Sequence, residues 1–308
     1  MNNVQLNWLK RAMRVAFPFL ILGLLWQWLD GQKILTWLSR ANGWWLFLAL
    51  VLLSVQLIAS AFRWQLTAHQ LGQGFTRRRA VGEYYLSMLC NLTLPGGVLG
   101  DAGRAWRGRT QAGLGTAVSA VVIERLAGQV AMISVLTLAI TGTAFGDHWL
   151  LGLAVVMVVA ALLLWRGPGW LKRFGHAIRK AWFTRHAWPG QLSLTVVILF
   201  CSLAAFAACA AAIGVSFSSL SSALVVLPLT LMVMALPVSV AGWGLRESAA
   251  ATLWPMAAIS SEAAVAASIL YGLVATTSVL PGLVTAFGVR PREQSGAPEN
   301  SLGQQTEP

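Results

Sequence analysis

The chain alternates between long apolar runs and short polar segments, and the length of the runs predicts helices that cross a membrane. A helix needs about 20 apolar residues to span about 30 Å of hydrocarbon. The runs that approach or exceed this length are 15–29, 43–62, 117–143, 149–165, 192–214 and 262–287. The first run follows a basic segment and lacks a small-residue cleavage site, so we expect a retained span rather than a removed signal peptide. The pattern predicts an all-α polytopic membrane protein with about six full spans.

Two further apolar stretches, 81–99 and 222–258, are interrupted by helix breakers. Each contains Leu-Pro, a glycine five residues after the proline and an arginine nine residues after it. The matched residues are Pro95, Gly100 and Arg104, then Pro237, Gly242 and Arg246. Proline removes a backbone donor and glycine permits unusual φ values, so we expect two broken or re-entrant helical hairpins. The alternative is a chance recurrence in a glycine-rich membrane chain.

The positions of the basic residues indicate whether these two stretches cross the membrane. Basic residues concentrate on the cytoplasmic side of a bacterial inner membrane. If the interrupted stretches cross, 12 basic residues face outward and 9 inward. If both return to the side they entered from, 18 face the cytoplasm and three face outward. We therefore predict re-entrant hairpins and two cytoplasmic termini. Two short crossings within 222–261 would preserve the same topology and remain an alternative.

This topology predicts one transmembrane domain at 15–288, between a cytoplasmic N-terminus at 1–14 and a disordered cytoplasmic tail at 289–308. Within the domain, 15–145 and 149–288 have the same order of elements in opposite orientations. Inverted repeats with interrupted helices are frequent in secondary transporters, where the broken segments meet near the midplane and form the substrate site.

Composition agrees with a membrane protein and indicates the charge of its ligands. Hydrophobic residues make up 57% of the chain and charged residues only 10%, with a net charge of +12. Positive-inside bias explains part of this charge, and affinity for anionic phosphate head groups is the functional explanation. The segment 166–190 mixes basic and aromatic residues and predicts a helix lying on the inner leaflet. We expect no nucleic-acid binding, because the basic residues lie in short loops.

Sequence motifs for catalysis or metal binding do not occur. The three cysteines lie in apolar runs, and the four histidines show no ligand spacing. There is no phosphate-binding loop and no nucleophile–base motif. We therefore expect neither a cofactor nor an enzyme active site.

The interrupted stretches supply the candidate substrate-binding residues. An opened turn followed by a helix start presents free N–H groups that suit a lipid phosphate, and Arg104 and Arg246 can add a charge-assisted clamp. We expect Asp101 and Glu247 to pair with these arginines while no substrate is bound; the alternative is a static ion pair at the hairpin base. The full candidate set is Asn91, Pro95, Gly96, Gly97, Gly100, Asp101, Arg104, Glu124, Arg125, Pro237, Gly242, Gly244, Arg246 and Glu247.

Glu124 and Arg125 lie inside the predicted span at 117–143. A charge within a span costs roughly 2.5–3.5 kcal/mol on insertion scales, so such residues are functional candidates. Consecutive helical residues point about 100° apart, so these two do not neutralise each other directly. We expect Glu124 to face a hairpin arginine and Arg125 to face the cavity or snorkel inward. A proton-carrier role is the alternative for Glu124.

These motifs resemble the flippase-like family built on the lysylphosphatidylglycerol synthase transmembrane region. The match carries Asn91, Leu94-Pro95-Gly96, Gly100, Arg104, Glu124-Arg125, Pro237 and Gly242-Trp243-Gly244-Leu245-Arg246-Glu247, and covers about residues 10–288. Where the family more usually has Gly-Gly-Leu, this chain has Ala241-Gly242-Trp243, which places an indole beside the second break. The resemblance implies translocation of a lipid or lipid-linked substrate. In the multiple peptide resistance factor such a domain is fused to an aminoacyl transferase, and we expect none here.

Two functions follow from this resemblance and from the charge pattern. The first is movement of an anionic phospholipid or polyisoprenoid-linked sugar between leaflets. The second is a non-transporting membrane subunit whose partner is a lipid-modifying glycosyltransferase or acyltransferase. A membrane-embedded enzyme is disfavoured, because the sequence offers no nucleophile–base or metal-ligand set.

Overall fold

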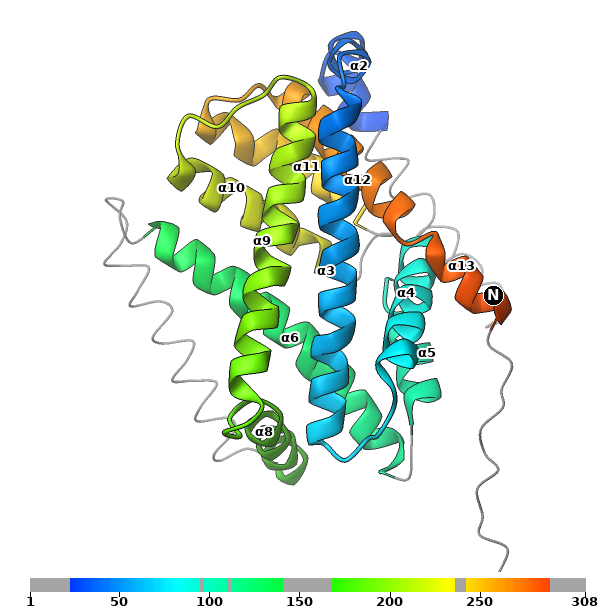
Figure 1. The fold of residues 1–308 in the computed structure, drawn as a ribbon. Coiled ribbons are helices and arrows are strands. Elements are labelled where there is room, and N and C mark those ends of the chain that lie inside the picture. The colour runs from blue at the N-terminus through cyan, green and yellow to red at the C-terminus, as the bar shows by residue number, and fades with distance from the viewer. Residues whose placement is uncertain (1–22, 95–96, 110–111, 141–167, 236–241, 289–308) are drawn as a thin grey trace, which may run out of the picture.

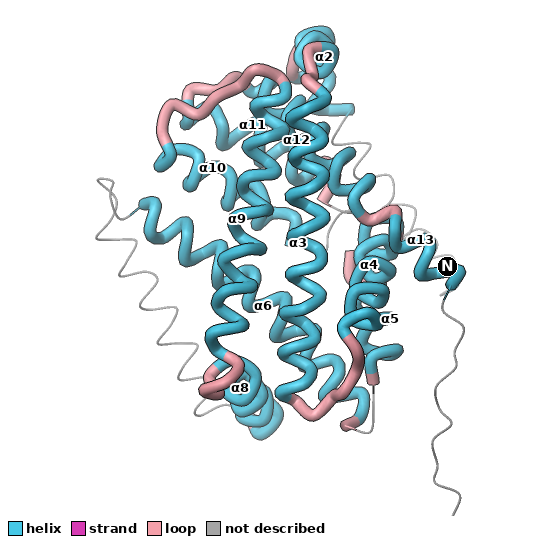
Figure 2. The backbone as a smooth tube through the Cα atoms, in the orientation of Figure 1, coloured by secondary structure: helices cyan, strands magenta, loops and turns pink. Residues whose placement is uncertain are grey.

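The structure is a computed structural model that describes residues 23–94, 97–109, 112–140, 168–235 and 242–288. Within these ranges the chain forms helices joined by loops, with no strand (Figure 2). The helices long and apolar enough to cross a membrane are α3 (Gly43–Gln70), α6 (Gly113–Ile140), α9 (Trp188–Ala212) and the segment Ser261–Thr285 formed by α12 (Ser261–Ser278) and α13 (Pro281–Gly288).

These helices confirm four of the predicted spans. Residues 15–22 of the first predicted span and all of 149–165 lie outside the described residues. The N-terminus at 1–14 and the tail at 289–308 also lie outside them. What the structure establishes is therefore a helical membrane protein with at least these long apolar helices.

Helices α3 and α9 lie side by side through the centre of the molecule and run antiparallel (Figure 1). Near one end, Asn42 N donates to Ala212 O at 2.8 Å. Toward the other end, Gln191 Nε2 donates to Thr67 Oγ1 at 2.9 Å. The sequence prediction ended the α3 span at residue 62, which is wrong, because Arg63 is buried by partners from two other helices and the helix continues.

The interrupted stretches both fold into short helices on either side of a break. The first comprises α4 (Arg77–Thr93) and α5 (Leu99–Gly108). The second comprises α10 (Leu220–Met232), the 3-10 turn η1 (Val233–Ala235), α11 (Leu245–Leu253) and the 3-10 turn η2 (Trp254–Ala257). At 1.5 Å per residue, α5 and α11 are only about 15 Å long, which is half of the hydrocarbon thickness. Neither short helix could cross a membrane alone.

Contacts between the two arms show that the first hairpin returns toward its own start. Gly100 N, in the first turn of α5, donates to Asn91 Oδ1 in the last turn of α4 at 2.8 Å. Arg107, near the end of α5, donates through Nε to Glu83 Oε2 at 2.6 Å. Farther along, Arg79 donates to the Arg107 carbonyl at 2.9 Å. The arms are antiparallel, as a re-entrant hairpin requires.

The second hairpin is antiparallel in the same way. Trp254 Nε1 donates to Thr230 Oγ1 at 3.1 Å, and Arg246 at the start of α11 contacts Met234 Sδ at the break. These contacts bring α11 back past the end of α10, and both helices are short, which is the arrangement expected of a hairpin.

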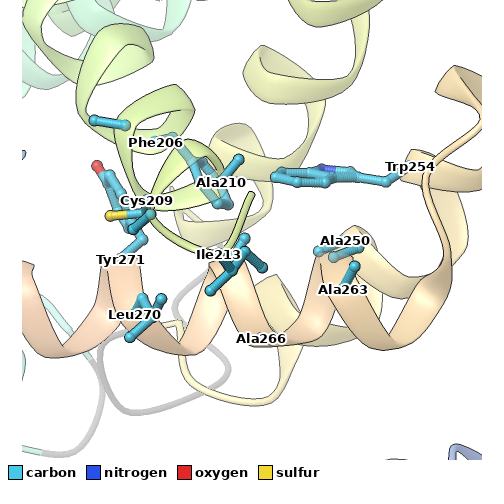
Figure 3. Close-up of a cluster of buried hydrophobic side chains, with 14 of the residues drawn as sticks. Phe206, Cys209, Ala210, Ile213, Ala250, Trp254, Ala263, Ala266, Leu270 and Tyr271 are labelled. Atoms are coloured by element: carbon cyan, nitrogen blue, oxygen red, sulfur yellow. The ribbon is translucent and has the colours of Figure 1, made fainter. Parts of the chain in front are cut away.

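The larger core cluster joins α9, α11 and α12 through small residues and a few large rings. Phe206 of α9 stacks on Tyr271 of α12, with ring centroids 4.6 Å apart, and lies 5.2 Å from the ring of Trp254 (Figure 3). Buried alanines belong to the same cluster, including Ala210, Ala250 and Ala266 (Figure 3). Small residues let the helix backbones approach closely, which is how membrane helices gain packing energy.

Basic segments gather at one end of the helix bundle. The end of α3 is joined to the loop after α8 (Gly169–Trp182), where Thr184 Oγ1 donates to Gln70 Oε1 at 3.3 Å. Helix α8 lies across this end (Figure 1), and α4 begins here with three consecutive arginines. At the opposite end lies α2 (Gly31–Ser39), capped by Asp30. The predicted helix within 166–190 is thus confirmed as a helix, and the loops predicted to be cytoplasmic share one end.

The positive-inside rule then predicts which end faces the cytoplasm. In a variant whose native cysteines are replaced by alanine, Arg109→Cys and Arg173→Cys should react with an impermeant thiol reagent from the cytoplasmic side. Arg40→Cys, exposed at the other end of the bundle, should react only from the opposite side. Labelling of positions 40 and 109 from the same side would contradict the hairpin geometry, because a crossing at 81–99 would place both outside.

Candidate functional site

Charged residues of the first hairpin and of α6 meet in one buried cluster, together with Arg63 of α3. Glu124 Oε1 accepts from Arg63 Nη2 at 2.9 Å, and Glu124 Oε2 lies 3.4 Å from Arg104 Nη2. Arg104 Nη2 also lies 3.1 Å from Asp101 Oδ1. The predicted contact of Glu124 with a hairpin arginine and the predicted Asp101–Arg104 pair are both present in the structure.

Asp101 joins the hairpin to α6 through a second arginine. Its Oδ2 accepts from Arg125 Nε at 2.8 Å and lies 2.7 Å from Arg125 Nη2, a two-pronged contact that fixes the guanidinium plane. Its Oδ1 also accepts from Ser87 Oγ at 3.1 Å. The Arg125 side chain remains 45% exposed although it lies near the middle of α6. Among the charged groups of this cluster, Arg125 is therefore the one most open to a ligand.

The cluster contains more positive than negative charge. Two carboxylates, Asp101 and Glu124, face three guanidinium groups, and each carboxylate already has a close partner in Arg125 or Arg63. Arg104 is the cation in excess: it is fully buried, and its Nε and Nη1 have no hydrogen-bond partner among the described residues. A buried guanidinium in this state favours an additional anion nearby.

Two aromatic rings hold the Arg104 guanidinium in place. Its central carbon lies 4.7 Å from the Trp64 ring centroid and 4.5 Å from the Tyr84 ring centroid. Cation–π contacts of this kind stabilise a desolvated cation by about 2 kcal/mol. They compensate only part of the cost of a buried charge, so the excess cation still depends on the neighbouring carboxylates.

Arg63 was not among the predicted site residues. Its Nη1 donates to Thr195 Oγ1 of α9 at 3.2 Å, and its Nη2 donates to both the backbone and the side chain of Glu124. Arg63 thus connects α3, α6 and α9. A signal was present in the sequence, because Gln56, Ser60, Arg63 and Thr67 recur at the spacing of one helix face.

A polar pocket of about 140 Å³ lies beside this cluster, between α3, α4, α6, α9 and α10. Arg63, Glu124 and Arg125 are its charged lining residues. Its neutral polar groups are Gln56, Ser60, Tyr84, Gln129 and Ser202. A pocket of this size holds several water molecules or a small polar group. Polar and charged side chains that face a cavity within apolar helices make this pocket the candidate functional site.

The backbone N–H groups at the two helix starts, which were predicted to be free for anion binding, donate to side chains of the protein. Gly100 N donates to Asn91 Oδ1, and Gly244 N donates to Glu247 Oε2 at 2.6 Å. The prediction of free N–H groups is therefore wrong at these two positions, because a side chain from the same hairpin reaches each donor. Asn91 acts here as a cap supplied by the neighbouring helix. Gly100 permits the crossing, since a Cβ there would overlap the Ser87 carbonyl.

The second hairpin forms a separate buried ion pair. Arg246 Nη2 lies 2.5 Å from Glu247 Oε1, and Arg246 Nε donates to Ser268 Oγ of α12 at 2.9 Å. The guanidinium lies 5.1 Å from the Trp243 ring centroid and 5.5 Å from that of Tyr271. The predicted Arg246–Glu247 pair is present, and its charges balance.

The predicted site residues thus divide between two clusters, with no hydrogen bond or ion pair joining the clusters within the described ranges. Gly97, Gly242 and Gly244 have φ values of 61°, 77° and 83°, which only glycine adopts readily, and they shape the two breaks. Pro95, Gly96 and Pro237 lie outside the described residues. Among the described residues, no group of His, Cys, Asp and Glu is placed to hold a metal ion.

Comparison with known proteins identifies the family. A family model of the lysylphosphatidylglycerol synthase TM region matches residues 13–282, which is most of the chain. No curated protein sequence and no solved structure matches the chain.

Glu124 is expected to be the main counter-ion of the cluster. Glu124→Gln should lower thermal stability strongly, because a buried ion pair that loses one partner costs about 3–5 kcal/mol. Glu262→Gln is the matched control, since Glu262 makes no ion pair within the described residues. The melting temperatures of the purified proteins in the same detergent check this. Equal melting temperatures for the two variants would show that Glu124 is not the main counter-ion of the cluster.

Gly272 of α12 is expected to be required for the second ion pair. A Cβ at position 272 would overlap Arg246 Nη2 and lie 2.8 Å from the Trp243 ring, so Gly272→Ala should destabilise the protein. Gly115→Ala is the control, because no atom lies within 4 Å of its added Cβ, and alanine favours a helix by about 1 kcal/mol. Thermal unfolding should rank Gly272→Ala below wild type and Gly115→Ala at or above it; the reverse order would contradict the packing.

Proposed function

The chain belongs to the family of the lysylphosphatidylglycerol synthase TM region, and we propose that it moves an anionic phospholipid or polyisoprenoid-linked sugar between the leaflets of a bacterial inner membrane. The observation that carries the proposal is the polar pocket within the apolar helices, lined by Arg63, Glu124 and Arg125 and adjoining a cluster with one cation in excess. Family membership alone supports a lipid-related role in a membrane.

The arrangement of helices supports the inverted-repeat topology that such transport uses. Helices α3 and α9 occupy matching places in the two predicted repeats, 15–145 and 149–288, and they run antiparallel. Each is followed by a broken hairpin whose second helix carries a buried arginine between two aromatic rings and an acidic residue in its first turn. We place both termini in the cytoplasm, on the side of the basic loops.

Charge balance gives the proposed mechanism of binding. A monoanionic phosphate that contacts Arg125 completes a set of three anionic and three cationic groups. The Asp101 carboxylate then turns from Arg125 toward Arg104. The Nε and Nη1 atoms of Arg104 have no protein acceptor among the described residues. The substrate thus replaces a carboxylate as the partner of Arg125, and after the exchange each anion still has a guanidinium partner.

The half-exposed position of Arg125 supports lateral entry of the head group. A guanidinium near the middle of a span is costly unless it faces water or an anion. The phosphate can remain beside Arg125 while its acyl chains stay in the surrounding bilayer, so only the head group needs the pocket. The proposal contains no covalent step and no cofactor.

Transport of labelled lipid in proteoliposomes tests the proposal. Lipids labelled on an acyl chain and protected from a leaflet-specific quencher should become accessible when wild-type protein is present. Arg125→Gln should slow this movement by at least about tenfold, because a charge-assisted contact contributes about 1.5–3 kcal/mol. Arg109→Gln is the control, since it removes the same charge from an exposed residue at the hairpin end.

The outcome also separates the second function from the first. Reconstituted wild-type protein that moves none of the anionic lipids, yet binds a lipid-modifying transferase, would favour the accessory-subunit role. Equal rates for wild type and Arg125→Gln, with transport intact, would leave translocation standing and remove Arg125 from the binding site.

A further inference from the structure

We infer that the pocket selects substrates in which a phosphate diester carries a neutral, hydroxyl-bearing head group, and rejects those that carry an ammonium group. This inference rests on the proposed lipid-translocating function and narrows its substrate class. It depends on the neutral polar residues that line the pocket, namely Gln56, Ser60, Gln129 and Ser202.

An ammonium group would find no available carboxylate in this pocket. Among the described lining residues, Glu124 is the one with a carboxylate. Its Oε1 already accepts from Arg63 and from Tyr84 OH, and its Oε2 faces Arg104. A substrate ammonium would therefore lie among guanidinium groups without a counter-ion, and like-charge contacts in a partly desolvated site oppose binding.

Substrate hydroxyl groups would find unused hydrogen-bond partners among the neutral lining residues of the pocket. The Gln129 side chain makes no hydrogen bond within the described residues, so its amide offers both donors and an acceptor. Gln56 uses Nε2 to donate to Ser60 Oγ at 3.2 Å, and its Oε1 remains available. Ser202 Oγ donates to Ile198 O and keeps acceptor capacity. A hydroxyl can accept from the Gln129 amide as well as donate to these acceptors, whereas an ammonium group only donates and leaves the amide donors of Gln129 unpaired.

The lining of the pocket combines charged and neutral polar groups. Arg63, Glu124 and Arg125 carry charge, and the amide and hydroxyl groups come from α3, α6 and α9. A phosphate at Arg125 leaves the next group of the head facing Gln129, which is one helical turn farther along α6. The shared chemistry is a phosphate diester followed by hydroxyls, as in phosphatidylglycerol or a polyprenyl-phosphate sugar.

Four acyl- or polyprenyl-labelled lipids test this selectivity in proteoliposomes with wild-type protein. Phosphatidylglycerol should move about tenfold faster than phosphatidylethanol, which has the same charge but no head-group hydroxyl, since one or two hydrogen bonds contribute about that factor. Phosphatidylethanolamine, which adds an ammonium group, should be slowest. If polyprenyl-phosphate glucose moves faster than phosphatidylglycerol, the preferred substrate is a lipid-linked sugar; in the opposite case it is a phospholipid.

Gln129→Leu provides a second measurement. It should bring the ratio of phosphatidylglycerol to phosphatidylethanol rates close to one, because leucine fills a similar volume without hydrogen bonds. Ser193→Ala, on the exposed face of α9, should leave the ratio at the wild-type value. The wild-type lipid comparison decides alone if Gln129→Leu does not fold.

The outcomes distinguish this inference from the proposed function. Movement of phosphatidylglycerol and phosphatidylethanolamine at equal rates would overturn the selectivity and leave translocation intact. An unchanged ratio in Gln129→Leu would also overturn it. Failure of all four lipids to move would instead reject the proposed function.

Discussion

The structure depends on the burial of two guanidinium groups and two carboxylates among apolar helices, with a third, half-exposed guanidinium beside them. Such charges are stable only when each has close partners, because an isolated buried ion costs several kcal/mol or more. Arg63, Asp101 and Glu124 supply these partners by tying α3, α6, α9 and the first hairpin to one another. In the proposed function, the remaining excess of one cation attracts an anionic ligand. The same set of charges would then serve both stability and ligand binding.

Much of the fold could be predicted from apolar runs and helix breakers, because hydrocarbon thickness sets the length of a span. The hairpins at the two Leu-Pro motifs and the contact of Glu124 with a hairpin arginine followed from the same reasoning. Arg63 was missed because a charge usually ends an apolar run, and only tertiary partners allow α3 to continue past it. The occupation of the helix starts by Asn91 and Glu247 was also missed. Those contacts depend on how two arms pack, which spacing along the chain does not specify.

The two hairpins share a design and differ in charge. Arg246 has a balanced carboxylate, a hydroxyl partner and two rings, so its cluster is complete within the protein. Arg104 lacks partners for two nitrogens among the described residues and adjoins a pocket. The sequence motifs placed both arginines in equivalent roles. The surroundings instead favour a structural role for Arg246 and ligand-linked electrostatics for Arg104, an asymmetry that motif matching alone does not reveal.

In the proposed function, a lipid phosphate pairs with the Arg125 guanidinium. Solid-state magnetic resonance measures this contact directly, through dipolar dephasing of guanidinium nitrogen-15 by the phosphorus-31 of phosphatidylglycerol in reconstituted protein. The account predicts dephasing that is lost in Arg125→Lys and retained in Arg109→Lys, because the first residue faces the pocket and the second lies at the exposed hairpin end. Dephasing that is unchanged in Arg125→Lys and lost in Arg109→Lys would place the lipid phosphate at the bundle end and contradict the account.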